Sequence, residues 1–237
     1  MTRAGILTTS AVLILISSVA HSQGERGRGR GRGNEEKQSV PPQEQQQRID
    51  EQRRRDAAYQ DALNAQVRAA QQAAAALQQQ KRAAQFDLHR QYLANLQRQQ
   101  ERLRAQRDLQ RDPYYATPMS YRYRVGDADR ETNQYGADIL RQAVRNGYEQ
   151  GWRAGRADRA DGWPSDYRKS YAYQDANYGY NGNYVPQTDY NFYFREGFRR
   201  GYEDGYASRS QYGTVVNGTP SILATILAGI LGLATIR

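Results

Sequence analysis

A duplicated glycine pattern is the feature that most constrains how this chain can fold. The segment 140–156 recurs 50 positions later as the segment 190–206. The matching glycines are Gly147, Gly151 and Gly155 in the first copy and Gly197, Gly201 and Gly205 in the second. Apolar or small residues accompany them at the i, i+3, i+4, i+7 spacing of one helix face. The repeat predicts two helices; the alternative is a partly disordered Tyr/Gly-rich segment in which the glycines mark turns.

These glycines are costly in a helix and therefore predict a close contact. Each glycine costs about 1 kcal/mol relative to alanine, so three disfavour a helix by roughly 3 kcal/mol. Glycines four residues apart form a flat stripe that another backbone can approach. We expect the two helices to pack through these stripes, either on each other or on a copy of themselves.

Composition bounds the class of protein. The chain has 237 residues, a net charge of +9 and a mean hydropathy of −0.98, which favours a small folded part with long appendages over one large core. The absence of cysteine excludes disulfides, thiol nucleophiles and thiolate metal sites. One histidine, His89, lies outside the leader, so we expect no histidine-based metal cluster or catalytic triad, and no cofactor.

The N-terminus has the pattern of an export signal. Residues 1–22 read as a signal peptide, with Arg3 as the charged start, Ile6–Ile16 as the apolar stretch and a small-residue cleavage site. The alternative is an uncleaved anchor, although the apolar run is short for a membrane span. In either case we expect the protein to be exported, to a periplasmic, envelope-associated or extracellular location.

Residues 23–43 contain alternating arginine and glycine. Such a segment cannot bury a core and should be disordered. After a signal peptide, the partner expected for these arginines is an anionic polymer of the envelope, a lipid headgroup or extracellular nucleic acid. The alternative is a solvated linker with no specific partner. The candidate polyanion-binding residues are Arg26, Arg28, Arg30 and Arg32.

Residues 44–112 lack glycine and proline and are rich in Gln, Arg and Ala, which predicts one long helix up to the Asp112-Pro113 stop. A weak heptad seam continues loosely through Tyr92, Leu96 and Leu103. A self-associating coiled coil, and hence a homo-oligomer, and a single solvated helix both fit. The seam residues are Leu63, Val67, Ala70, Ala74, Leu77, Lys81, Ala84 and Leu88.

Residues 113–135 read as a Tyr-rich linker, because Pro113, Pro118 and Gly126 interrupt regular structure. The oxygen-bearing side chains between Asp127 and Asp138 resemble a calcium loop. Thr132 stands where that loop needs glycine, and no helix precedes it. A plainer role for Asp138 is to cap the N-terminus of the next helix.

Residues 136–212 form the duplicated helical module. Of the 19 tyrosines, 17 lie between Tyr114 and Tyr212, and Asn181-Gly182 favours a tight turn between the two copies. Tyrosine with arginine is typical of polar aromatic binding surfaces, but tyrosines also stack on sugar rings or pack a small wet core. The sequence leaves these three uses open.

Residues 213–237 form an apolar C-terminal segment with an expected helix. The run Ile222–Ile236 has 15 residues, about 22 Å of helix, against a hydrocarbon thickness of roughly 30 Å. Oblique membrane insertion, contact with an envelope protein, and packing on the protein's own core all remain open. We expect membrane or partner contact, because the run ends an otherwise polar chain.

The stretch Asn146–Arg209 reads G-Y-x-x-G-x-x-x-G-x-x-D-R, a Tyr/Asp-rich spacer, then Y-x-x-x-F-R-x-G-F-x-x-G-Y-x-x-G-Y. This pattern resembles a Gly/Tyr-rich repeat of uncharacterised exported bacterial proteins, particularly from soil Acidobacteria. The resemblance covers roughly a quarter of the chain. It implies export and a repeat architecture, and it implies no activity.

Three functions are weighed from these patterns. The leading one is a mainly α-helical, non-enzymatic envelope-associated structural or interaction protein that self-associates through its helices. The second is a polyanion-binding protein that uses the arginine tail and the tyrosines. The third is a carboxylate-based hydrolase, although carboxylates this dense in a charged helical stretch are usually solvated partners of arginine. Its candidate residues are Asp158, Asp161, Asp166 and Asp175.

Overall fold

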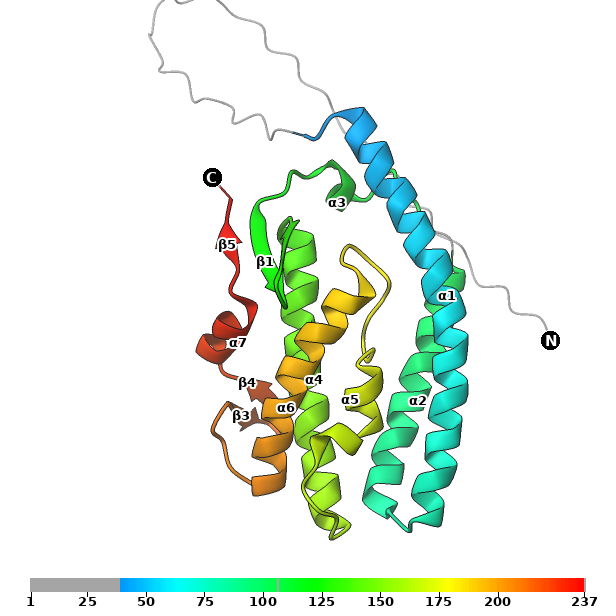
Figure 1. Ribbon diagram of the computed structural model, residues 1–237, viewed down its shortest axis with the longest axis vertical. Helices are drawn as coiled ribbons and strands as arrows, with labels where there is room; N and C mark the ends of the chain where they lie inside the picture. The colour runs from blue at the N-terminus through cyan, green and yellow to red at the C-terminus, as the bar shows by residue number, and fades with distance from the viewer. Residues whose placement is uncertain (1–38, 106, 237) are drawn as a thin grey trace, which may run out of the picture. The chain divides into compact units, whose positions relative to one another are not determined.

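A helical hairpin begins the described part of the chain. The computed structural model describes residues 39–105 and 107–236, all in one compact unit that is mainly helical, as predicted (Figure 1). Helix α1 spans Pro42–Gln79 and helix α2 spans Ala83–Arg104. Pro42 stands in the first turn of α1, where its missing N–H costs nothing. The signal peptide 1–22 and most of the tail 23–43 lie outside the described residues.

The prediction of one helix over 44–112 is wrong, because α1 ends at Gln79 and α2 begins at Ala83. Lys81 turns the chain with a φ of 56°. The Asp161 carboxylate, from a distant part of the sequence, accepts hydrogen bonds from the backbone N–H groups of Ala84 and Gln85, at 2.9 and 3.0 Å. The start of α2 is thus capped by a tertiary contact, and no local glycine or proline marks it.

The predicted heptad seam closes within the chain. Leu63, Val67 and Ala70 of α1 are buried in the same cluster as Tyr92 and Leu96 of α2. The 3–4 spacing therefore describes two antiparallel helices folded onto each other and onto the rest of the unit. The described structure leaves little of this seam free for a coiled coil between chains.

The linker 113–135 is more regular than its breakers suggest. Helix α3, Pro113–Ala116, is followed by strands β1, Tyr121–Val125, and β2, Ala128–Thr132. Strand β5, Ala234–Thr235, pairs with the free edge of β1 and completes an antiparallel sheet of order β2-β1-β5. The chain's C-terminal segment therefore returns to the middle of the sequence.

The duplicated helices are α4, Gln134–Ala160, and α6, Gln187–Ala207. Asn133 caps α4 by accepting from the backbone N–H groups of Tyr135 and Gly136. The prediction of Asp138 as the cap is therefore wrong, because the helix begins four residues earlier; Asp138 instead pairs with Arg141 at 2.7 Å.

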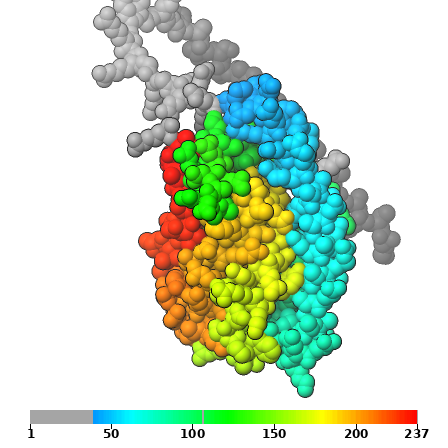
Figure 2. Space-filling view, in the orientation of Figure 1, coloured from blue at the N-terminus to red at the C-terminus, as the bar shows by residue number. Residues whose placement is uncertain are grey.

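The connector between α4 and α6 returns the chain to the starting end of α4. It contains a 3-10 turn, Tyr167–Lys169, and helix α5, Tyr171–Asp175. Gly182 adopts a φ of 79°, and the Asn181 side chain accepts from the backbone N–H of Asn183, so the expected bend is present at this Asn-Gly pair. The connector lies against the α1–α2 hairpin, as the yellow and cyan surfaces in Figure 2 show.

The apolar end folds as a hairpin and a short helix. Strands β3, Gly213–Val216, and β4, Thr219–Ile222, are joined by an Asn217-Gly218 turn in which both residues have positive φ. Helix α7 spans Ala224–Leu231 and buries Leu227 and Leu231 against the core cluster. Among the described residues, no helix is both long and apolar enough to cross a bilayer.

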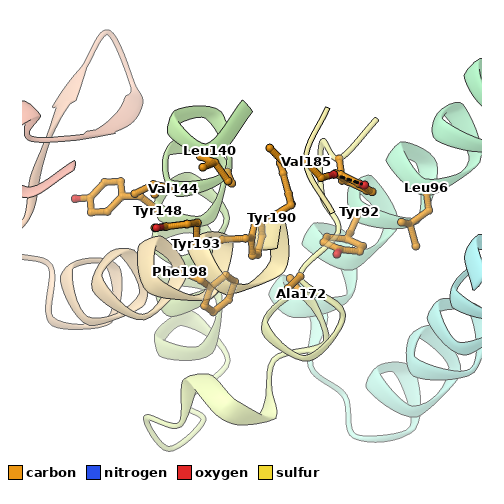
Figure 3. Packing of buried hydrophobic residues seen from close by; sticks show 14 of the residues in the cluster. Tyr92, Leu96, Leu140, Val144, Tyr148, Ala172, Val185, Tyr190, Tyr193 and Phe198 are labelled. Atoms are coloured by element: carbon orange, nitrogen blue, oxygen red, sulfur yellow. Dashed lines mark hydrogen bonds between the residues drawn. The ribbon is translucent and has the colours of Figure 1, made fainter. Parts of the chain in front are cut away.

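Tyrosines fill the core. Figure 3 shows the cluster running from Tyr92 and Leu96 on α2, past Tyr190 and Phe198 on α6, to Val144 and Tyr148 on α4. The expectation of a small folded part with long appendages is therefore wrong for the described residues. Mean hydropathy misleads here because it scores tyrosine as polar, whereas its ring buries as much area as phenylalanine. The fully buried tyrosines are Tyr92, Tyr115, Tyr148, Tyr180, Tyr190, Tyr193 and Tyr202.

Candidate functional site

The six predicted helix-packing glycines meet at the contact between α4 and α6. The two helices run in the same direction and cross along the glycine stripes (Figure 1). A Cβ built on Gly151 would lie 2.0 Å from the Phe198 carbonyl oxygen, and one on Gly201 would lie 2.0 Å from that of Tyr148. Any side chain would collide with the partner's backbone there. The prediction that the stripes pack together is confirmed, and the pairing is within one chain.

The contact has an internal two-fold relation. Gly147 meets the carbonyl oxygen of Phe194, and Gly197 meets that of Val144, which is the same contact after the shift of 50 positions. Gly155 and Gly205 repeat the relation with Tyr202 and Trp152. A carbonyl oxygen set over a glycine Cα suits Cα–H···O contacts worth roughly 0.5–1 kcal/mol each. These contacts and the tight packing offset the cost of glycine in the helices.

Two buried tyrosine–carboxylate pairs lock the crossing. The Tyr148 hydroxyl of α4 donates to Asp204 of α6 at 2.9 Å, and the Tyr202 hydroxyl of α6 donates to Asp158 of α4 at 2.5 Å. Asp204 also accepts from the backbone N–H groups of Gln211 and Tyr212, which anchors the chain leading into β3. Burial is the main reason that the pKa values of Tyr148 and Tyr202 are raised.

Asp158 joins the glycine module to the helical hairpin. Its carboxylate accepts from Arg82, at the turn between α1 and α2, and from Gln85, in the first turn of α2. The Arg82 guanidinium also lies over the Trp163 ring, 4.4 Å from its centroid. Burial raises the pKa of the Asp158 carboxyl, outweighing the hydrogen bond from Tyr202 and the charge of Arg82, which lower it.

The other carboxylates weighed for hydrolysis also serve the fold. Asp161 caps α2, and Asp166 accepts from the backbone N–H of Arg168 in the 3-10 turn. Asp175 accepts from Tyr92 and Asn177, and burial raises the pKa of its carboxyl. Asp158, Asp161 and Asp175 are therefore engaged by donors from neighbouring elements, and Asp166 by a donor within its own turn.

A cavity of about 180 Å³ opens beside this network, between the α1–α2 hairpin, α4 and α5. Polar side chains on its wall include Arg82, Gln85, His89, Gln150 and Lys169. The His89 Nε2 atom lies 2.6 Å from the Ala70 carbonyl oxygen, and burial lowers the pKa of this imidazole. Sequence reasoning missed this site, because its wall is assembled from four elements that no motif links.

The remaining predicted sites have different outcomes. Arg26, Arg28, Arg30 and Arg32 lie outside the described residues. Of the acidic side chains in the suspected calcium loop, Asp127 precedes β2, Asp129 and Glu131 lie on it, and Asp138 lies in α4. Across 39–105 and 107–236, no cluster of three or more His, Asp or Glu has the geometry of a metal site. The tyrosines, for which the sequence left three uses open, largely pack the core.

Comparison with protein-family models, curated proteins and solved structures gives no match to this chain. The resemblance to exported Gly/Tyr-rich repeat proteins therefore stays a prediction, and function must be argued from the contacts above.

Gly201→Ala tests the glycine contact. The added methyl would lie 2.0 Å from the Tyr148 carbonyl oxygen, so the helices must separate. We expect the free energy of unfolding to fall by about 2–4 kcal/mol in urea titrations, the range of other packing defects in cores. Gly229→Ala in α7 is the matched control, because a Cβ there meets nothing within 4 Å. It should be neutral or stabilising by up to about 1 kcal/mol; equal losses for both variants would contradict the proposed contact.

The tyrosine core predicts steep alkaline unfolding. Burial raises the pKa of Tyr193 and of Tyr184 from 10.0 to about 12, and raises that of Tyr123 further. Above pH 10 the unfolded chain ionises these groups while the folded chain does not, so stability present below pH 10 is lost as pH rises toward the folded pKa. Each such group removes up to about 1.4 kcal/mol per pH unit.

Phenolate absorbance and far-UV circular dichroism, recorded together, check this. We expect a step in tyrosine ionisation to coincide with loss of the helical signal. Complete ionisation of all 19 tyrosines with an unchanged helical signal would contradict burial of their hydroxyls.

Proposed function

We propose that this chain is an exported, non-enzymatic structural or interaction protein that self-associates. The observation that carries the proposal is that the side chains considered for catalysis or binding instead stabilise the fold. The buried carboxylates hold helices together, and the tyrosines fill the core. What remains at the surface suits contact with partners rather than turnover. Export rests on the N-terminal pattern of residues 1–22.

The β3–β4 hairpin is the surface that best supports self-association. The glycine stripes and the heptad seam are both used within the chain, so neither is free to join copies. Val215 and Val216 of β3 are 44% and 56% exposed, and with Leu223 they are the large hydrophobic side chains most exposed among the described residues. A paired copy would cover them.

The two edges of this hairpin differ. Val215 pairs with Pro220, which has no N–H, so the Val215 backbone N–H and C=O point to the outer edge of β3. Pro220 blocks the opposite edge of β4, whereas β3 carries no proline or charge that would prevent pairing. Two copies can join β3 to β3 antiparallel, as an isologous dimer. A four-residue strand supports a weak contact rather than an obligate one.

Val216→Lys tests the proposal by placing a charge on the pairing strand. For this test, the full chain is expressed in a bacterial host and purified from the periplasm. The mass of the purified protein then shows whether residues 1–22 have been removed. Sedimentation equilibrium should then show a concentration-dependent dimer that Val216→Lys weakens about tenfold or more.

Thr219→Lys is the matched control, because Thr219 pairs with Val216 but lies on the strand whose outer edge is blocked. It should leave the dimer within about twofold. A wild-type chain that stays monomeric at all concentrations, or equal effects of the two lysines, would refute self-association through β3.

Polyanion binding is the second candidate. It is favoured by the exposed Arg90, Arg98 and Arg102 on α2, which have no carboxylate within ion-pair distance among the described residues, and by the tail arginines in the sequence. In an exported protein an anionic polysaccharide is the partner that fits best.

Heparin titrations at increasing salt test this candidate. The affinity should fall steeply with salt, and replacing Arg26, Arg28, Arg30 and Arg32 with Gln should reduce the log–log slope by about one for each arginine–anion pair removed. Replacing Arg98 and Arg102 with Gln instead measures how much of the heparin affinity comes from the arginines of α2. Salt-insensitive or absent binding would reject polyanion recognition; tighter binding to RNA than to heparin would reject the polysaccharide.

A further inference from the structure

The cavity beside Arg82 has a polar group with no protein partner. Gln150 of α4 is 2% exposed and lines the cavity, and its amide takes part in none of the side-chain hydrogen bonds among the described residues. In the same wall, the Nε atom of Arg82 is buried and has no hydrogen-bond partner among the described residues. The neighbour of Gln150 in the wall, Gln85, donates to both Ala154 and Asp158. Polar groups in such a place are normally satisfied by water or by a ligand.

The charges on the wall favour an anion. Arg82 and Lys169 both line the cavity, and no carboxylate does. Asp158 offsets part of the Arg82 charge from behind the wall. Lys169 stands at the solvent side, with its ammonium 3.7 Å from Asp166. The imidazole of His89 stays neutral near pH 7, since burial lowers its pKa, and it adds no charge.

The rest of the wall is apolar. Leu77 of α1, Leu88 of α2 and Tyr171 of α5 face the same space as the Gln150 amide. A cavity of about 180 Å³ has room for about six waters at their liquid share of about 30 Å³ each, and so for a small organic molecule. A molecule of that size can touch the amide with one end and the apolar side chains with the other.

We propose that this cavity binds a small organic carboxylate. Its carboxylate accepts a hydrogen bond from the Gln150 amide in the field of Arg82 and Lys169, and its apolar body lies against Leu77, Leu88 and Tyr171. This site shares no residue with the β3 edge or the arginine tail. A negative result for self-association or polyanion binding would therefore not affect this proposal, and a negative result here would not affect those two.

Isothermal titration of the full chain with benzoate tests the proposal, with benzamide as the neutral molecule of the same shape. We expect benzoate to bind with one site per chain and at least about tenfold more tightly than benzamide, the difference made by one hydrogen bond to a charged group. Equal affinities would overturn the assignment of an anion, and no binding of either would overturn the proposal by showing a cavity that holds water alone.

Two variants locate the site. Gln150→Leu should weaken benzoate about tenfold or more, while its thermal midpoint stays equal or rises because the amide has no partner to lose. A lowered midpoint with unchanged benzoate affinity would mean that Gln150 serves packing alone, and would overturn the proposal.

Lys169→Gln should weaken benzoate about two- to fivefold, as expected for an exposed charge. Lys81→Gln is the matched control, because it removes the same charge from the nearby turn without touching the cavity wall. Equal effects of the two lysine variants would point to general attraction by the basic surface and would contradict this site.

Discussion

The close approach of two helix backbones at six glycines is the constraint on which the rest of this structure depends. Carbonyl oxygens of one helix stand where a Cβ of the other would be, so the distance between α4 and α6 leaves no room for side chains. Because the helices run in the same direction, the chain must travel back along their length before α6 can begin. Residues 161–186 make that return, and α5 and the 3-10 turn lie on it. Parallel packing thus determines where the connector can run and which surface it offers to the α1–α2 hairpin.

Tyrosine suits the space that this contact creates. With no side chain on the stripe itself, large rings must flank it and fill the volume out to the neighbouring elements, as Tyr190 and Phe198 do in Figure 3. Each tyrosine also carries a hydroxyl into the interior, and a buried hydroxyl needs a partner. Asp158, Asp189 and Asp204 supply acceptors for three of them. The core therefore combines packed aromatic rings with hydrogen bonds between their hydroxyls and carboxylates. This explains how a chain of low mean hydropathy can form a large buried core.

The sequence predicts what is local or repeated and misses what is assembled across the chain. The glycine stripes were predictable because both copies carry the same spacing, and their pairing in one chain could not be told from pairing between chains. The break at Lys81 was hidden because its determinant, Asp161, lies far along the sequence. The Asn217-Gly218 pair is a strong local signal for a hairpin, but the expectation for the C-terminal segment rested on the apolar run Ile222–Ile236 that follows it. The cavity could not have been predicted, since Gln150 lines it only together with residues of α1, α2 and α5 that are far away in the sequence.

The parallel pairing of α4 and α6 within one chain is best measured as a distance between a label in the last turn of α4 and one just after the end of α6. The chain has no cysteine, so spin labels can be placed at Arg159→Cys and Arg209→Cys alone. A parallel pair within one chain gives a short distance that does not change when labelled chains are diluted with unlabelled ones. An antiparallel pair would separate the labels by about 30 Å, the length of a 21-residue helix. That longer distance, or a short one that disappears on dilution, would contradict the glycine contact described for α4 and α6.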